Sequence, residues 1–421
     1  MPKISVPYGK TTQGAVVSDE IELEIVDVDV PKVTMQPEKL LKEAMDNPIG
    51  SDRIENLVKK EDKVLIVVND HTRPGPNQII VKELITRLTG AGVPDQNIKF
   101  IIATGSHRAS TEDEIANIIG AEYQKRYQVI VHNCMDKESM VYLGKTTCGM
   151  PLYVNKAAVE NSFIITTGLI SPHHTAGYSG GRKSIVPGIA GFETLKIHHS
   201  FPIRPFEPSM GFIYGNPFHE AALEAAKMVN VKFMVNAVQD PHKQNIAFVA
   251  GDIELAHAKG VEICQKVSEV EIHGLADIVI TSPGGYPRDR NLYQAQKALS
   301  VAELLGKPNC IYILMANAED GIGEGVFRQW LVEAKKPQDV IERFRKEGFN
   351  VGSNKAFMYA RAMTKGRVII VSENLKEKDI NEMMLEWAPN LQVAIEKASS
   401  EKAPKKIIVL PRAVNIIPHV I

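Results

Sequence analysis

The hydrophobic and polar positions of this chain divide it into short apolar runs and longer amphipathic segments. Short apolar runs predict buried strands, and segments with a period near 3.6 predict helices. A run such as KVLIVV, at residues 63–68, has no polar position after Lys63 and is typical of a strand buried on both faces. Strands are expected at residues 21–30, 63–68, 98–103, 129–131, 163–167, 233–238 and 246–249, the last two as a hairpin-like pair.

Helices are expected between these strands, and two of them carry clear start signals. One begins at Ser110 or Thr111, with acidic residues in its first turn. Another has Asn216 as its cap and Pro217 in its first helical position. Further helices are expected at residues 78–88 and 251–270. Strands that alternate with helices indicate βαβ units and a parallel sheet.

A second series of strands and helices begins at residues 277–281 (DIVIT), so a domain boundary is expected near residues 268–275. The predicted fold is α/β, with two domains and an active site in the cleft between them. Residues 1–270 are expected to form the larger N-terminal domain, with a parallel-type sheet, and residues 275–400 a smaller C-terminal α/β domain. The last strand, within residues 405–421, can return to either domain, the N-terminal one included.

The bulk composition is that of a soluble globular protein, with 44% hydrophobic and 24% charged residues among 421. A net charge of −1 gives no electrostatic indication of nucleic acid or of an anionic membrane as partner. The N-terminus has no apolar signal core, and no apolar run is long enough to cross a bilayer. The four cysteines are far apart, which argues against a disulfide framework and favours a reduced, cytoplasmic location.

Polar segments rich in histidine, arginine and lysine follow three of the predicted strands. They are Asn69-Asp-His-Thr-Arg-Pro74, Thr104-Gly-Ser-His-Arg108 and Ser171-Pro-His-His-Thr-Ala-Gly-Tyr-Ser-Gly-Gly-Arg-Lys-Ser184. In open α/β sheets, ligands bind at the carboxyl ends of strands. One polar loop would need no explanation, but three loops with this chemistry predict one shared cleft.

The third segment ends in Gly180-Gly181-Arg182-Lys183, which has some features of a phosphate-binding loop. Such a loop needs glycine directly before lysine, and here Arg182 fills that position. An NTPase is therefore a poor interpretation. The glycines can still offer backbone N–H groups to a phosphate, and Arg182 can add a bidentate contact.

The histidine pairs His173-His174 and His198-His199 suggest a metal site or proton transfer. Adjacent side chains diverge on regular elements, so only one member of each pair is expected to face a site. Neither pair has the spacing of common zinc motifs. In the second domain, Gln294 and Lys297 lie on one face near the start of a predicted helix. They are equally compatible with carboxylate binding and with a solvated surface.

Taken together, these motifs resemble the lactate racemase family, whose members use a nickel-pincer nucleotide. The resemblance covers nearly the whole chain and rests on the three segments above, on His198-His199, and on the downstream GGYP and YQAQK motifs. It implies a covalent cofactor, a Ni(II) pyridinium-3,5-bisthiocarboxylate mononucleotide, attached to Lys183. It also implies a small 2-hydroxy acid as substrate and accessory enzymes that make the cofactor.

The resemblance assigns roles to individual residues. His107 and His173 match the acid/base pair, His199 the nickel ligand, and Arg73 the arginine beside the substrate, with Asp70 near it. Thr72, Gly180, Gly181 and Arg182 are expected to contact the cofactor, and Tyr293, Gln294 and Lys297 to hold the substrate carboxylate.

The residue types suit such a reaction. The Cα–H of a 2-hydroxy acid is a poor acid beside a carboxylate, so it is better removed as hydride while a base takes the hydroxyl proton. No side chain accepts a hydride, so a cofactor must. Two imidazoles suit a two-faced reaction because each is base for one enantiomer and acid for the other. Arg73 can polarise the developing carbonyl of the keto acid.

Arg288 and Arg290 depart from the pattern of the lactate-specific members, which are less basic after GGYP. An added cation there can accept a second carboxylate or a polyhydroxy chain, so malate, another larger 2-hydroxy acid or a sugar acid is an alternative substrate. Two other functions stay open from the residues alone: a zinc hydrolase built on the histidines, and a nucleotide-binding module that uses the glycine loop.

Overall fold

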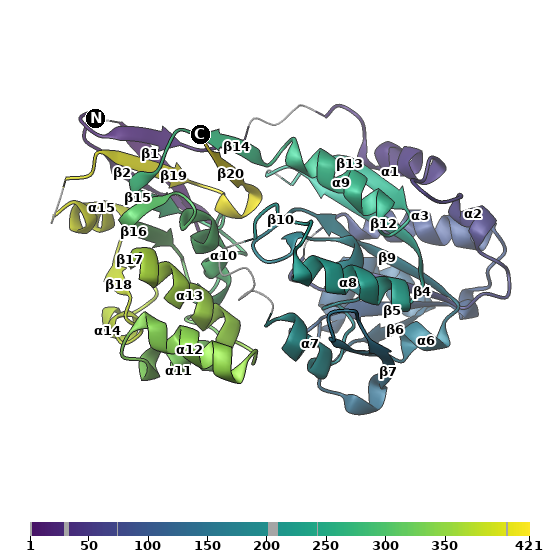
Figure 1. Cartoon of the computed structure of the whole chain (residues 1–421). Coiled ribbons are helices and arrows are strands. Elements are labelled where there is room, and N and C mark those ends of the chain that lie inside the picture. The colour runs from purple at the N-terminus through teal and green to yellow at the C-terminus, as the bar shows by residue number, and fades with distance from the viewer. Residues whose placement is uncertain (1, 29–32, 74, 201–208, 242, 401–402) are drawn as a thin grey trace. The chain divides into compact units, whose positions relative to one another are not determined.

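The computed structural model describes residues 2–28, 33–73, 75–200, 209–241, 243–400 and 403–421. The chain divides into two compact units. One, here called the central unit, comprises residues 30–205 and 211–267, and the other, the terminal unit, comprises residues 1–29, 206–210 and 268–421. Each unit is built around its own six-stranded sheet (Figure 1). The predicted fold class, α/β with two domains and parallel sheets, is confirmed.

The sheet of the central unit has the strand order β13-β12-β9-β4-β5-β6. All neighbours pair in parallel except β12 and β13, which form the expected antiparallel pair. The strands are β4 (Val64–Asn69), β5 (Ile98–Ala103), β6 (Gln128–Val131), β9 (Phe163–Ile170), β12 (Val231–Gln239) and β13 (Asn245–Gly251). Its main helices are α1 (Pro37–Asp46), α3 (Asn77–Gly90), α4 (Glu112–Ile119), α7 (Phe192–His198), α8 (Pro217–Met228) and α9 (Leu255–Gln265).

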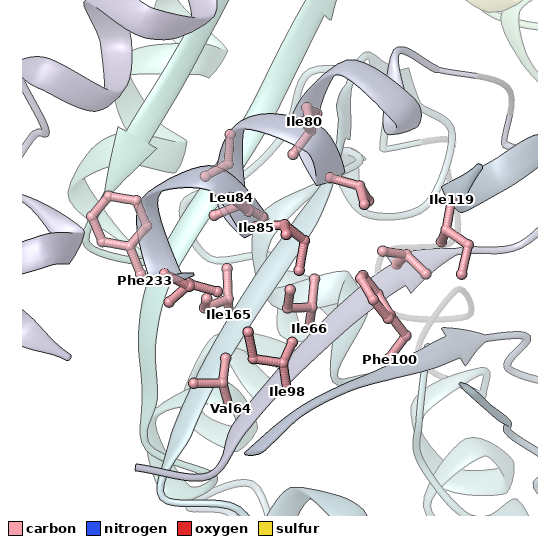
Figure 2. Packing of buried hydrophobic residues seen from close by; sticks show 14 of the residues in the cluster. Val64, Ile66, Ile80, Leu84, Ile85, Ile98, Phe100, Ile119, Ile165 and Phe233 are labelled. Carbon is pink, nitrogen blue, oxygen red and sulfur yellow. The ribbon is translucent and has the colours of Figure 1, made fainter. Parts of the chain in front are cut away.

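The core of this unit lies between helix α3 and the middle of the sheet. Ile80, Leu84 and Ile85 of α3 pack over Val64 and Ile66 of β4, together with side chains of β5 and β9 (Figure 2). Residues 64–68 are all fully buried. The uninterrupted apolar run follows from this position, because a central parallel strand is covered on both faces.

The sheet of the terminal unit is wholly parallel, in the order β18-β17-β16-β15-β19-β3. Its strands are β3 (Glu22–Ile25), β15 (Ala276–Thr281), β16 (Gly306–Met315), β17 (Gly366–Val371), β18 (Glu386–Ala388) and β19 (Lys406–Leu410). Helices α10 (Leu292–Ala302), α11 (Gly325–Glu333), α12 (Pro337–Glu347), α13 (Ser353–Lys365) and α15 (Leu391–Ser399) belong to the same unit.

The two ends of the chain correct the expected domain limits. The N-terminal residues were expected in the domain of residues 1–270, but β3 pairs with β19 in the terminal unit. The hairpin of β1 (Lys3–Tyr8) and β2 (Thr11–Val16) packs Ile4, Val6 and Tyr8 into the core of that unit. The strand expected within residues 405–421, β19, also belongs to the terminal unit, because it pairs with β15. Long-range pairing of this kind leaves no local signal in the sequence.

The helix expected over residues 251–270 is also shorter in the structure, where α9 spans Leu255–Gln265. Helix α9 ends at Gln265, and β14 (Glu269–Ile272) follows and pairs with β20 (Ile417–Val420). The antiparallel hairpin of β7 (Met140–Lys145) and β8 (Pro151–Asn155) is a further element that the pattern did not indicate. Among the described residues, none of the helices has the length and apolar character needed to cross a membrane.

We expect the stability of the central unit to depend on His132, a buried imidazole whose Nε2 lies 3.1 Å from the carbonyl oxygen of Ala190. Burial lowers the pKa of His132 to about 4, whereas an unfolded imidazole titrates near 6.5. The unfolded chain therefore binds more protons below pH 6.5, and the contribution of His132 is present at pH 7 and lost as the pH falls. Between pH 7 and pH 5 it amounts to about 2 kcal/mol.

Denaturant unfolding at pH 5, 6 and 7 measures this contribution. His132→Asn, which cannot titrate, should flatten the pH dependence of the unfolding free energy by about that amount. His419→Asn, at an exposed imidazole of the terminal unit, is the matched control and should leave the slope unchanged. Equal slopes in the native chain and in His132→Asn would contradict the expectation.

Candidate functional site

Three neighbouring strands of the central unit bring the candidate residues to one edge of its sheet. Strand β4 pairs in parallel with β5 on one side and with β9 on the other. The carboxyl ends of these strands therefore lie together, as the sequence predicted from the polar segments that follow them. The backbone N–H of Gly105 donates to the carbonyl of Gly188 at 2.9 Å, which ties the loop that carries His107 to the segment after Lys183.

Asp70 and His107 form a close pair at this edge. The distance between Asp70 Oδ2 and His107 Nδ1 is 2.7 Å, and the carboxylate is almost completely buried. Burial by itself would raise the pKa of Asp70, but the hydrogen bond and charge of His107 and the nearby Arg73 outweigh it and lower the pKa to about 2. Asp70 is thus ionised and accepts the Nδ1–H of His107. The unprotonated Nε2 of a neutral His107 is then available as a base.

Thr72 and Arg73 extend this pair into a network. The Thr72 hydroxyl donates to Asp70 Oδ1 at 2.7 Å and accepts from Arg73 Nη1, also at 2.7 Å. In this structure the Thr72 hydroxyl thus positions two residues of the predicted acid/base site. Its expected contact with a cofactor stays a prediction.

His173 has the opposite hydrogen-bonding pattern. It ends strand β10 (Pro172–His173), which pairs with β11 (Gly177–Tyr178) in a tight hairpin. Its Nδ1 accepts the backbone N–H groups of Thr175 and Ala176, at 3.2 and 3.1 Å. A neutral His173 therefore carries its proton on Nε2 and presents a donor there. The two predicted acid/base residues thus differ in tautomer, and the chain's own hydrogen bonds set both.

Phe218, at the start of helix α8, brings the other predicted residues together. The Nζ atom of Lys183 lies 5.5 Å from the centre of its ring. The ring centres of His199 and His173 lie 5.6 and 6.4 Å from the same point, and that of His198 only 3.7 Å. Lys183, His173 and His199 therefore surround one buried aromatic ring.

Phe218 was not predicted as a site residue. The start of α8 at Asn216 and Pro217 was predicted, however, and it places Phe218 in the first turn of that helix. The Asn216 side chain accepts the N–H of Phe218 and also donates to the carbonyl of Thr175, in the hairpin of His173. This cap therefore fixes Phe218 relative to the hairpin.

His198 and His199 point in different directions, as expected for adjacent residues, with their rings inclined at 74°. His198 is fully buried, and its Nε2 donates to the carbonyl of Phe218 at 2.9 Å. Burial holds the pKa of His198 well below its usual range. His198 therefore has a structural role, and the half-buried His199 is the better candidate for a metal ligand.

No group of three or more histidine, cysteine, aspartate or glutamate side chains with the arrangement of a metal site occurs in the part of the chain that the structure describes. A zinc hydrolase built on protein ligands thus finds no support there. The Lys183 amine and the His199 imidazole, beside one apolar ring, fit a different group: a metal that receives most of its donors from an organic cofactor attached to that lysine. These residues thus fit the cofactor that the resemblance implies.

The glycine turn before Lys183 is held by contacts within the central unit. Gly180 and Gly181 both adopt positive φ values, of 80° and 52°. The N–H of Gly181 donates to Asn236 Oδ1 at 2.7 Å, and the Arg182 side chain is fully buried among backbone carbonyls. The N–H of Gly181 and both Nη atoms of Arg182 thus bond groups of the chain itself, and the expected contacts of these residues with a cofactor stay predictions.

Tyr293, Gln294 and Lys297 lie in the terminal unit, on helix α10. Lys297 Nζ donates to Gln294 Oε1 at 2.8 Å, so the two side chains share one face of the helix, as predicted. The ring of Tyr293 is flanked by Phe327 and by the amine of Lys355, and burial raises the pKa of Tyr293. A buried lysine beside this helix is a further feature that the sequence did not assign.

Arg288 and Arg290, which follow the GGYP motif, differ in their partners. Arg290 Nη2 lies 2.8 Å from Asp320 Oδ2, and its Nε lies 3.5 Å from Glu319, so acidic side chains already surround its charge. Arg288 donates to the uncharged amide oxygen of Asn415 at 3.0 Å.

Two protein-family models match this chain, one over its N-terminal half and one over its C-terminal part. The model "Lactate racemase N-terminal domain" matches residues 8–209, and "Lactate racemase C-terminal domain" matches residues 272–418. A lactate racemase from Thermoanaerobacterium thermosaccharolyticum is 34% identical over 425 residues, 99% of either chain. One from Lactiplantibacillus plantarum is 33% identical over 428 residues, 99% of this chain and 100% of that protein.

Solved structures agree with these matches. The lactate racemase apoprotein from T. thermosaccharolyticum has a TM-score of 0.93 at 33% identity, with 99% of this chain and all of that one covered. A protein from Thermotoga maritima, 18% identical, has a TM-score of 0.69 over 91% of this chain and 98% of its own, which shows a shared fold. The identity over the full length and the two matched domains establish that this chain belongs to the lactate racemase family and is a racemase, an isomerase.

Proposed function

We propose that this chain racemises or epimerises a 2-hydroxy acid, with a nickel-pincer nucleotide attached to Lys183 and its metal bound by His199. The observation that carries the proposal is the grouping of Lys183, His199 and His173 around Phe218. The Asp70–His107 pair on the neighbouring strand end adds an oriented imidazole. When bound, the cofactor supplies the hydride acceptor that no side chain offers.

The proton steps follow from the tautomers of the two histidines. His107 presents an unprotonated Nε2, because Asp70 holds its Nδ1–H, and is thus prepared to take the hydroxyl proton of one enantiomer. His173 presents an Nε2–H, because its Nδ1 accepts two backbone N–H groups. In the opposite direction the roles exchange: the protonated His107, stabilised by the Asp70 carboxylate, is the acid, and His173 acts as base in the tautomer that leaves its Nε2 unprotonated, which gives up the two backbone hydrogen bonds to Nδ1.

Substrate binding is assigned to side chains of both units. Arg73 is held by the Thr72 hydroxyl and is proposed to stabilise the developing carbonyl oxygen. Tyr293, Gln294 and Lys297 are proposed to hold the substrate carboxylate, with the Lys297–Gln294 hydrogen bond giving the two side chains a fixed geometry.

The identity of the acid is proposed only as a class: lactate, or a larger acid such as malate or a sugar acid. Arg290 is the poorer candidate for a second contact, because Asp320 and Glu319 offset its charge, so Arg288 is proposed for this role. The proposal also includes accessory enzymes that synthesise the cofactor, a cytoplasmic location, and no nucleic-acid or membrane partner.

The cofactor assignment is tested on protein produced together with cofactor-synthesis enzymes. Intact mass should show a covalent adduct on the native chain and none on Lys183→Ala, because only Lys183 offers the amine at this position. Nickel measured on the same samples should be lost in His199→Ala and largely kept in His198→Asn, since His198 bonds the backbone of Phe218. Nickel lost from His198→Asn but kept by His199→Ala would show that the wrong histidine was chosen.

The acid/base assignment predicts that His107→Ala and His173→Ala each lower kcat by about two orders of magnitude or more. Both directions of racemisation should be impaired, because each direction uses both imidazoles, while the equilibrium between enantiomers stays unchanged. His71→Gln is the matched control. His71 is the residue between Asp70 and Thr72 in the sequence, but its Nδ1 contacts the Ser110 hydroxyl, at 3.4 Å, and it has no assigned role in the reaction. Near-native turnover of either alanine variant in both directions would rule out the two-histidine scheme.

The substrate class is tested with single enantiomers of lactate, malate and a sugar acid. Arg288→Ala should lower kcat/KM for malate or the sugar acid by about tenfold, the effect expected for a charge-assisted contact, and should change lactate little. Arg290→Ala, the neighbouring control, should change all three slightly and evenly. Equal effects of both variants on every substrate would place both arginines outside the substrate site.

A further inference from the structure

The carbonyl groups of the turn before Lys183 converge on a single side chain, the guanidinium of Arg182. Arg182 Nη2 donates to the carbonyl of Ala176 at 2.9 Å. Its Nη1 lies 3.3 and 3.2 Å from the carbonyl oxygens of Ser179 and Gly180. One residue thus collects three carbonyls from the chain segment directly before itself, and Lys183 is the next residue.

The charge of Arg182 is compensated in an unusual way. Its side chain is completely buried, and in the described ranges no carboxylate forms an ion pair with it. Burial lowers the pKa of Arg182 to about 9, so it stays protonated at neutral pH. A buried cation costs free energy unless polar groups surround it. Here carbonyl dipoles and one imidazole replace the usual carboxylate. Loss of any of these groups should therefore raise the free energy of the buried guanidinium.

That imidazole belongs to His257 of helix α9. Arg182 Nη1 lies 2.7 Å from His257 Nε2, where a guanidinium can only donate. The same Nε2 lies 2.9 Å from the carbonyl oxygen of Ser179, so the imidazole joins the guanidinium to the carbonyls of the turn. Burial keeps the pKa of His257 well below its usual range, so the ring is neutral near pH 7. The ring also packs on Gly181, where an added Cβ would lie 2.9 Å from His257 Cδ2.

Asn236 of strand β12 holds the same turn from the side of the sheet. Its Oδ1 accepts the N–H of Gly181 at 2.7 Å, and an added Cβ at Gly180 would lie 2.5 Å from that oxygen. The turn is thus fixed through its carbonyls by Arg182 and through an N–H by the central sheet. Lys183 follows directly, with its amine over the ring of Phe218.

We propose that Arg182, His257 and Asn236 form a buried clamp that fixes the backbone of residues 176–183 and so positions Lys183 for attachment of its cofactor. They are positioning residues, since their polar groups bond the backbone or one another. The clamp itself is a property of the chain alone, whereas its effect on Lys183 rests on the proposed function.

The clamp is tested first without cofactor, by amide hydrogen exchange of the full-length chain. Arg182→Lys keeps the charge but cannot bond three carbonyls and His257 together, so exchange across residues 176–184 should become about tenfold faster or more. The matched control is Arg87→Lys, at another buried arginine of the central unit, which pairs with Glu55, Glu83 and Asp46 instead. It should leave that segment unchanged. Native-like exchange of the segment in a folded Arg182→Lys would overturn the clamp.

A second pair of variants keeps the test decisive if Arg182→Lys does not fold. His257→Gln retains an acceptor for Arg182 and should keep most of the protection of residues 176–184, whereas His257→Leu should lose it. Equal protection in the two variants would contradict the role given to the His257 acceptor.

The effect on Lys183 is measured by intact mass on protein produced with cofactor-synthesis enzymes. The adduct fraction should fall severalfold in His257→Leu and Arg182→Lys and recover in His257→Gln. An undiminished adduct in variants with a loosened turn would show that the clamp does not position Lys183. Absence of the adduct from the native chain would instead refute the proposed function, while the exchange results would still decide the clamp.

Discussion

The parallel pairing of β4 with β5 and β9 is the constraint on which the rest of the site depends. Because β4 is buried along residues 64–68, its register against both neighbours is fixed by apolar packing rather than by the polar loops. The chain can therefore place charged and strained segments at the ends of these strands without loss of the fold. Asp70 and His107 come from two of those ends and His173 from the third, and none of the three is held by its own element alone.

Burial decides which polar groups of the central unit can change protonation. Asp70 keeps its charge because His107 and Arg73 outweigh the cost of burial, whereas His132, His198 and His257 are held neutral by it. The histidines thus separate into two kinds: imidazoles that bond the backbone or a buried arginine, and half-exposed imidazoles at the strand ends. The two residues proposed to transfer protons, His107 and His173, belong to the second kind.

The sequence predicted those features of the fold and site that have a local cause. The cap of α4 is Thr111, with Glu114 closing a capping box, and α8 begins at Asn216 and Pro217 as expected. The neighbouring strand ends followed from apolar runs and the polar segments after them. The position of β3 beside β19 did not, because the partners lie almost a whole chain apart. The burial of Arg182 could not be predicted for a related reason: it depends on the tertiary packing of α9 and β12, which the local glycine-rich segment does not indicate.

The different tautomers of His107 and His173 have a consequence for how one site can treat two enantiomers. His107 is oriented by a carboxylate, which stabilises its protonated form, whereas His173 is oriented by two backbone N–H groups, which oppose a proton on Nδ1. The two imidazoles therefore differ in the ring nitrogen that the chain's own hydrogen bonds favour for the proton. The equilibrium between mirror-image acids is unity, so the difference cannot favour either product. It can only change which proton transfer limits each direction, with the slower one expected where His173 must act as the base.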